Sequence, residues 1–328
     1  MDNLCHSLVG AALSRAGLGK RTALATATLV IGANLPDVDV LAYAWGSDTA
    51  LGFRRGWTHG VLALALWPFL LTGMMMAWDR LVRRRRRPGL EPARPRELFL
   101  LSVISILSHP FLDWLNNYGM RWLMPFEDVW FYGDVLFIID VWIWLALGIG
   151  FLASRWLARR GAPNPERPAR VALIAVCVYI LLLSGSMLAA RKTARESLAD
   201  AGQTPRRLMA GPLPVTPLRR QIVADVGDRY ALGAVDWLER PFHAPGDPAE
   251  VAKNASHPAI ARAAATREGV IFLHWARFPF FTVEETEESW IVRMTDARYT
   301  LNPGTGFGAL TVEVKKKRDE VAPPVPIP

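Results

Sequence analysis

An apolar helix interrupted by two carboxylates is the feature that most constrains this chain. The stretch Thr22–Trp45 begins as an apolar segment long enough to enter a bilayer, and then runs into the sequence NLPDVD. Because Pro36 removes a helix hydrogen bond and disfavours helical backbone at the residue before it, the helix should end or kink here. Near a bilayer centre each ionised Asp costs about 2.5 to 3.5 kcal/mol. Asp37 and Asp39 therefore require hydration, protonation or a bound cation.

The composition is that of an integral membrane protein. Hydrophobic residues make up 51% of the 328 residues, 13 residues are Trp, and the mean hydropathy is positive. Several apolar runs approach the roughly 20 residues that a helix needs to span the hydrocarbon core. The net charge of +8 could indicate nucleic acid binding, but Arg80 and Arg83 to Arg87 directly follow an apolar run, where the positive-inside rule accounts for them. We therefore expect membrane lipids as partners and no nucleic acid.

The basic clusters set the predicted topology. Placing residues 20–21, 83–87 and 155–170 in the cytoplasm lets six membrane-embedded helices alternate, with the N-terminus and everything after residue 191 outside. We thus expect a multi-pass protein of the bacterial inner (cytoplasmic) membrane with a periplasmic C-terminal domain. The predicted fold class is mainly α, a polytopic helical membrane bundle followed by a small extracytoplasmic α+β domain.

The predicted domains are a membrane-embedded part at 1–192, a linker at 193–204, an outer α+β domain at 205–320 and a Pro-rich, unstructured tail at 321–328. Within the outer domain, residues 220–226 and 229–237 flank a Gly-Asp turn and predict a β-hairpin, and residues 247–267 look helical. Further strands are predicted at 270–276, 278–285, 290–295 and 308–314. On this assignment His274 lies in a strand.

Seven ionisable residues fall at the outer ends of the predicted membrane segments: His6, Asp37, Asp39, His59, His109, Asp113 and Asp134. The topology was assigned from Lys, Arg and apolar runs alone, so this coincidence was not built in. Imidazole and carboxylate together suit a divalent transition metal. We predict Asp37, Asp39, His59, His109 and Asp113 as ligands of one or two ions, with zinc as the expected metal. The alternatives are a proton relay or a structural polar cluster.

Local spacing supports this ligand set. His109 and Asp113 are four residues apart and share a helix face if the helix continues past Pro110. His59 follows Thr58, which is a suitable N-cap for the next span and would hold the imidazole at the interface.

Two further residues are predicted to be catalytic. His6 could act as a ligand or general base, or simply make a polar contact at a helix start. Asp134 could instead cap the membrane helix expected at 135–157. Asp140, inside an apolar run, should have a hydrogen-bond partner within the bundle. Arg54 and Arg55 flank the site and could hold a phosphate, or could be solvated.

The order of the motifs resembles a known family. An N-terminal His, NLPDVD, the RGxTHG pattern around His59 and the SHPxLD pattern around His109 resemble the YdjM-type (LexA-regulated) membrane-bound metal-dependent hydrolases over roughly residues 1–190. The resemblance implies hydrolysis and a metal-site set of His6, Asp37, Asp39, His59, His109 and Asp113. It does not explain the outer domain.

The leading functional hypothesis is a metal-dependent hydrolase with its site at the outer membrane–water interface, acting on a phosphoester or lipid-type substrate. The alternative is a non-enzymatic membrane protein, either a metal or proton-coupled transporter or a scaffold for the outer domain. A transporter would need polar residues that continue to the cytoplasmic side, and apart from Asp140 the inner halves of the spans are apolar. This favours the enzyme and leaves the oligomeric state undetermined.

Overall fold

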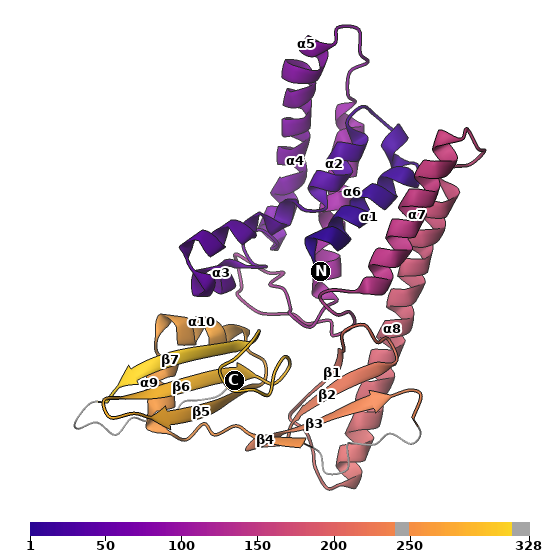
Figure 1. Ribbon diagram of the computed structural model, residues 1–328. Coiled ribbons are helices and arrows are strands. Elements are labelled where there is room, and N and C mark those ends of the chain that lie inside the picture. Colours follow the sequence, from indigo (N-terminus) through magenta and orange to yellow (C-terminus); the bar gives the residue numbers. More distant parts are fainter. Residues whose placement is uncertain (240–248, 317–328) are drawn as a thin grey trace. The chain divides into compact units, whose positions relative to one another are not determined.

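The computed structural model describes residues 1–239 and 249–316 (Figure 1). The chain divides into two compact units, one formed by Met1–Leu41 and Phe53–Gly185 and the other by Ala42–Gly52 and Ser186–Pro328. The last helix of the first unit continues into the second as far as Asp200, and therefore covers much of the predicted linker at 193–204.

Helices dominate the first unit (Figure 1). Its α-helices are α1 (Asn3–Arg15), α2 (Ala25–Gly32), α4 (Val61–Trp78), α5 (Arg84–Arg86), α6 (Pro95–Trp114), α7 (Val141–Arg159) and α8 (Arg167–Asp200). Its tighter and wider helical turns are the 3-10 segments η1 (Leu18–Lys20) and η2 (Leu35–Trp45) and the π-helix η3 (Asp79–Arg83).

The prediction of six membrane-embedded helices is not confirmed. Among the described residues, four helices are long and apolar enough to cross a membrane, namely Val61–Arg86, α6, α7 and α8. A fifth span results if α2 and η2 count as one broken segment, and the 45° bend between them confirms the break predicted at Pro36. With 13 residues, α1 is only about 20 Å long, which is shorter than the hydrocarbon core.

Close packing places the short helices inside the bundle. Helix α1 packs against α2 and α7, while α2 and α4 both pack against α6. A Cβ atom on Gly10 of α1 would lie 2.6 Å from the carbonyl oxygen of Leu29, so the close approach of α1 and α2 requires glycine there. Leu71, Leu98 and Ile106 form a buried cluster between α4 and α6.

Helix α7 begins at Val141 rather than at the predicted residue 135. The peptide N–H groups of Val135 and Leu136 donate instead to the carbonyl of Leu115, which ties this stretch to the end of α6. Asp140 is the N-cap, with its carboxylate accepting from the backbone N–H groups of Trp142 and Ile143, each at 3.1 Å. The capping role considered for Asp134 was therefore wrong.

The expectation of an internal partner for Asp140 was correct. Besides the two backbone N–H groups, the hydroxyl of Tyr179 on α8 donates to its Oδ2 at 3.2 Å. The carboxylate thus joins the start of α7 to α8, and its charge is offset by hydrogen bonds.

The first sheet of the second unit packs on the end of α8. Its strands are β1 (Arg207–Pro212), β2 (Arg219–Asp225), β3 (Arg229–Asp236) and β4 (Ala249–Ala252), which pair antiparallel in the order β1-β2-β3-β4. Strands β2 and β3 confirm the predicted hairpin. Small residues of α8, Ala190 and Ala194, pack with Leu208, Ile222 and Val235 of the sheet, which fixes the sheet to the helix.

The second sheet, in the order β5-β6-β7, is covered by short helices (Figure 1). The strands are β5 (Pro279–Glu285), β6 (Ser289–Asp296) and β7 (Ala309–Lys315), as predicted, and the helices are α9 (Pro258–Ala264) and α10 (Arg267–Trp275). The strand predicted at 270–276 was wrong because this stretch is α10, and His274 is therefore helical.

Two other predictions concern residues 247–267 and 321–328. The helix predicted at 247–267 is only partly correct, because β4 occupies its start and α9 its end. The predicted tail at 321–328 lies outside the described residues. Helix α3 (Ser47–Phe53) belongs mostly to this unit, since a guanidinium N–H of Arg267 donates to Thr49 Oγ1 at 2.8 Å.

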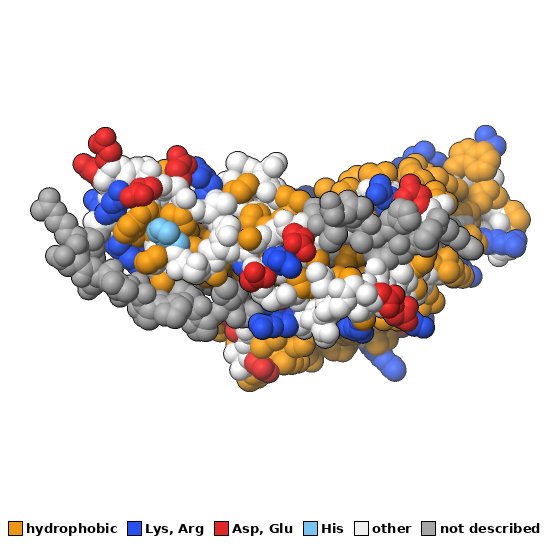
Figure 2. Space-filling view, turned by 90° about the horizontal axis from the view of Figure 1, so that it is seen from below, with side chains coloured by type: hydrophobic (Ala, Val, Ile, Leu, Met, Phe, Trp, Pro, Cys, Tyr) orange, Lys and Arg blue, Asp and Glu red, His pale blue; other side chains and the backbone are white. Residues whose placement is uncertain are grey.

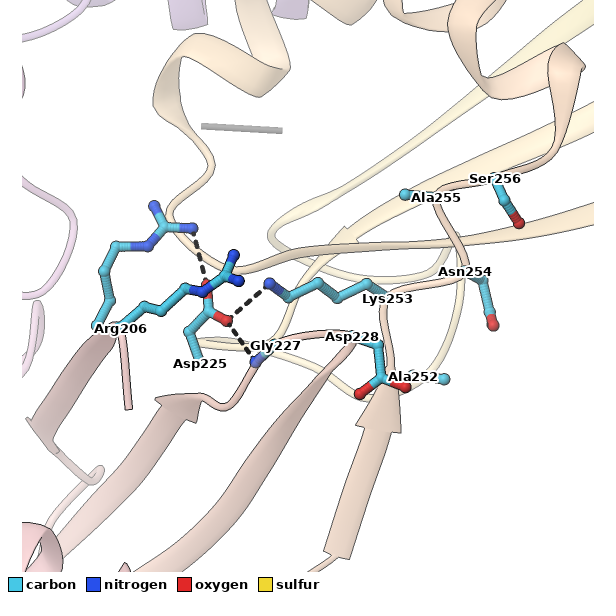
Figure 3. A pocket seen from close by; sticks show the side chains of 10 residues that line it. Arg206, Asp225, Gly227, Asp228, Ala252, Lys253, Asn254, Ala255 and Ser256 are labelled. Carbon is cyan, nitrogen blue, oxygen red and sulfur yellow. Dashed lines mark hydrogen bonds and ion pairs between the residues drawn. The ribbon is translucent and has the colours of Figure 1, made fainter. Parts of the chain in front are cut away.

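Charged side chains of both signs are interspersed on the face of the second unit that Figure 2 shows, as on an ordinary solvated surface. At one end of the first sheet they line a cavity of about 790 Å³ (Figure 3). There the carboxylate of Asp225 accepts from Lys253 Nζ at 2.7 Å, from the Gly227 N–H at 3.2 Å and from Arg207 at 3.5 Å. This cluster joins β1, β2 and the chain after β4.

The Asp225 cluster predicts an acid-sensitive contribution to the stability of the second unit. Burial alone would raise the pKa of Asp225, but the hydrogen bonds from Lys253 and Gly227 and the charges of Lys253 and Arg207 together hold that pKa below 3.8. Since the folded pKa lies below the unfolded one, the contribution is complete above about pH 4 and is lost as the pH falls through the folded value. Asp225→Asn should lower the thermal midpoint of the full chain at pH 7, measured by calorimetry.

The difference between Asp225→Asn and the wild type should shrink below pH 3.8. Asp228→Asn is the matched control, because Asp228 is exposed on the same turn and should leave the midpoint unchanged. A pH-independent difference for Asp225→Asn would contradict the assignment.

Candidate metal centre

Four side chains from three segments converge at one end of the helical bundle. Asp37 lies on η2, His59 directly precedes α4, and His109 and Asp113 lie in the last turns of α6. Helix α6 does continue through Pro110 to Trp114, which confirms that His109 and Asp113 share a face. All four side chains are buried. The sequence therefore predicted correctly that these distant motifs meet.

One ligand atom from each of these four residues lies within 4.8 Å of the other three. His59 Nε2 is 3.1 Å from His109 Nε2, 3.5 Å from Asp113 Oδ2 and 3.9 Å from Asp37 Oδ1. His109 Nε2 is 3.6 Å from Asp113 Oδ2 and 3.7 Å from Asp37 Oδ1. We call Asp37, His59, His109 and Asp113 the metal cluster.

These separations fit four ligands around one ion. Nitrogen and oxygen atoms bound tetrahedrally to zinc at 2.0 to 2.2 Å lie about 3.3 to 3.6 Å from one another. In addition, Asp37 Oδ2 is buried and accepts no hydrogen bond from the described residues. A buried acceptor without a donor is costly, whereas a cation would satisfy this oxygen. The cluster could thus hold a metal ion.

The other ring nitrogens fix which face of each imidazole is turned to the cluster. His109 Nδ1 lies 2.7 Å from the carbonyl oxygen of Ala33, which can only accept, so this nitrogen carries the hydrogen. His59 Nδ1 lies 2.9 Å from Thr58 Oγ1 and 3.4 Å from Asp39 Oδ2. In the neutral rings both Nε2 atoms then present lone pairs to each other at 3.1 Å. Such an arrangement is repulsive unless a cation lies between them.

The environment of His59 keeps its ring neutral. Burial, followed by the charges of His109, Arg55 and Arg54, lowers the pKa of His59 well below its ordinary value of 6.5. A neutral imidazole is the form that binds metal.

The predicted N-cap role of Thr58 was wrong, because Gly60 caps α4. The Thr58 hydroxyl instead lies between His59 and Asp39.

Asp39 lies beside the metal cluster rather than within its four converging residues. Its Oδ2 accepts from the Arg55 N–H at 2.8 Å and from the Thr58 hydroxyl at 3.3 Å, and approaches His59 Nδ1. The carboxylate is thus placed behind the ring of His59, where it can orient the imidazole.

Arg55 was predicted to flank the site, but its contacts with the carboxylates of the site were not predicted. Its side chain is buried, with Nη2 3.1 Å from Asp113 Oδ1, Nε 3.0 Å from Asp113 Oδ2, and Nη1 donating to Asn116 Oδ1 at 3.0 Å. A backbone φ of 52° lets the same residue direct its N–H to Asp39. Arg55 therefore positions two carboxylates of the site. The Arg in the pattern RGxTHG was its signal.

The two residues predicted to be catalytic lie in different places. The ring of His6 stacks on that of His109 at 3.7 Å, and its Nε2 lies 3.3 Å from Asp113 Oδ1, which the amino group of Met1 also contacts. Asp134 is buried in the loop between α6 and α7 with a φ of 57°, and is not one of the four converging residues.

Comparison with known proteins supports the helical unit as one family domain. The family model described as "YdjM inner membrane protein" matches residues 1–190, which include the whole metal cluster. The chain is also similar to "Uncharacterized protein YfhP" of Bacillus subtilis (strain 168), with 22% identity over 154 residues, or 44% of this chain and 44% of that protein. The chain thus matches less than half of the length of this relative. No solved structure matches.

Proposed function

The chain belongs to the family of YdjM inner membrane proteins, and we propose that it is a membrane-bound, metal-dependent hydrolase. The observation that carries the proposal is the 3.1 Å approach of His59 Nε2 and His109 Nε2, flanked by the oxygens of Asp37 and Asp113. Mixed imidazole and carboxylate donors at these separations suit zinc. The four ligands of the metal cluster account for one ion.

The residues around the cluster supply the rest of the chemistry. A zinc ion held by these four residues would have to expand from four to five ligands to bind a water, and it would then make that water more acidic. His6 is placed to take up the proton: its Nε2 can donate to Asp113, and its buried Nδ1 has no hydrogen-bond partner among the described residues. Arg55 and Asp39 hold Asp113 and His59 in position. The catalytic role of Asp134 remains a prediction.

The surroundings favour an anionic, amphiphilic substrate such as a phospholipid or another phosphoester. Arg54 lies 3.3 Å from Asp37 Oδ1 and is partly exposed, so its charge would attract an anionic group near the cluster. Trp57 and Phe126, on loops of the same unit, are 54% and 79% exposed. Exposed aromatic side chains at helix ends are typical of the membrane interface, where lipid head groups lie.

The test uses the full-length protein in nanodiscs, stripped with a chelator and reloaded with zinc or manganese. Phosphate or alcohol release is measured from phosphatidic acid and from a soluble aryl phosphate. Metal-dependent turnover of either substrate supports the proposal, and a preference for the lipid supports the interfacial site. Stoichiometric metal without turnover of any ester would instead favour the transporter or scaffold reading.

We also propose that the metal cluster faces the periplasm. The basic segment 83–87 and Arg159–Arg160 then lie in the cytoplasm, as the positive-inside rule requires. Reporter fusions after Arg87 and Arg160 should report the cytoplasm, and fusions after Gly52, Asn117 and Gly202 should report the periplasm. A cytoplasmic reporter at Gly52 would place the cluster at the inner face and overturn this topology.

A further inference from the structure

An apolar surface, bordered by the ion pair of Arg219 with Asp236 and by Glu239, lies beside α8 at one end of the first sheet of the second unit. Four of its side chains are large and exposed: Val215 (61%), Leu218 (44%), Trp237 (39%) and Leu238 (77%). They come from the β1–β2 turn and from the end of β3, which meet because the Trp237 N–H donates to the carbonyl of Leu218 at 3.0 Å. We call these four residues the apolar rim.

The rim contrasts with the other end of the same sheet. The chain from Gly211 to Leu218 has no charged residue. The opposite end is formed by the β2–β3 turn and the cavity of Figure 3, lined by Arg206, Arg207, Asp225, Asp228 and Lys253. One end of this sheet is therefore charged throughout, whereas the other carries large apolar side chains beside a few charges, as suits a membrane interface.

Contacts with α8 place the rim along the membrane-spanning helix. The indole N–H of Trp237 donates to Ser186 Oγ at 2.8 Å, and Arg220 Nε donates to the same oxygen at 3.3 Å. Ser186 lies within the apolar part of α8, between the exposed residues Leu182 and Leu188. The first charged residue after it is Arg191, five residues or about 7.5 Å further along the helix axis.

We infer that the apolar rim inserts into the interface of the lipid bilayer beside the outer end of α8. Leu188, two residues after Ser186 on α8, is 62% exposed, as a side chain in contact with lipid would be. A Trp whose ring lies against the helix while its N–H is satisfied is typical of this depth. The insertion would hold the second unit against the membrane surface at a fixed height.

The test places an environment-sensitive nitrobenzoxadiazole fluorophore on full-length protein in nanodiscs. Leu238→Cys carries the probe in the rim, and Asp228→Cys is the matched control at the charged end of the same sheet. Both are made in a Cys177→Ala background, in which the remaining native thiol, Cys5, is buried. Nanodiscs expose both membrane faces, so the result does not depend on topology or on hydrolytic activity.

We expect the emission from position 238 to shift to shorter wavelength and to be quenched by phosphatidylcholine brominated in its acyl chains, and that from position 228 to do neither. Equal emission and quenching at both positions would overturn the inference. A blue shift at position 238 without quenching by the brominated lipid would also overturn it, because protein, such as a second copy, would then cover the rim. If Leu238→Cys fails to fold, Val215→Cys provides the same readout.

Discussion

Replacing His109 with alanine should abolish metal binding and hydrolysis together. His109 Nε2 lies within 3.7 Å of ligand atoms from all three other members of the metal cluster. Without this nitrogen, only three of the four ligands would remain to hold the ion. Loss of a supporting contact alone costs about 10- to 100-fold in metal affinity, and loss of a ligand should exceed this range. Elemental analysis and competition with a chromophoric chelator measure the effect. His59→Ala and Asp37→Ala should behave alike.

Two controls separate loss of the ligand from loss of the fold. Asp140→Ala removes an N-cap and should cost about 1 kcal/mol in stability while leaving the metal content unchanged. His274 lies on α10 in the second unit, so His274→Ala should change neither the stability of the first unit nor the metal content. Full metal occupancy in His109→Ala, or wild-type protein that binds no metal after reloading, would favour the proton-relay or scaffold alternative.

The convergence of the metal cluster could be predicted because membrane topology determines at which end of the helical bundle each motif lies. Basic loops fix which helix ends share a side, and the motifs around Asp37, His59 and His109 all fall at ends on the same side. The i, i+4 spacing of His109 and Asp113 then determines a common face without any knowledge of packing. The break at Pro36 follows from backbone chemistry alone.

Other features depended on tertiary contacts that no local pattern encodes. The apolar run 270–276 suits a strand as well as a buried helix, and the deciding signal was Thr266, whose hydroxyl accepts from the Gly269 N–H as an N-cap. Arg55 resembled a juxtamembrane charge because burial among Asp113 and Asn116 is visible only in the fold.

Asp39→Asn should weaken metal binding less than His109→Ala does, by about 10- to 100-fold, because the structure places Asp39 behind His59 rather than on the ion. The carboxylate accepts from Arg55 and Thr58 and lies 3.4 Å from His59 Nδ1, so its charge favours the tautomer that leaves Nε2 for the metal. Asparagine keeps the shape but removes this charge.

Cobalt substitution distinguishes the orienting role of Asp39 from the ligand role that the sequence predicted. If Asp39 only orients His59, the visible spectrum of the Co²⁺ form of Asp39→Asn should keep the intensity of the wild type, because the number of ligands is unchanged. Thr58→Val, which removes the hydroxyl between the same two side chains, should cause a smaller loss of affinity with the same spectrum. If Asp39 instead ligates the ion, Asp39→Asn should match His109→Ala in affinity and alter the spectrum, since the coordination shell itself would have changed.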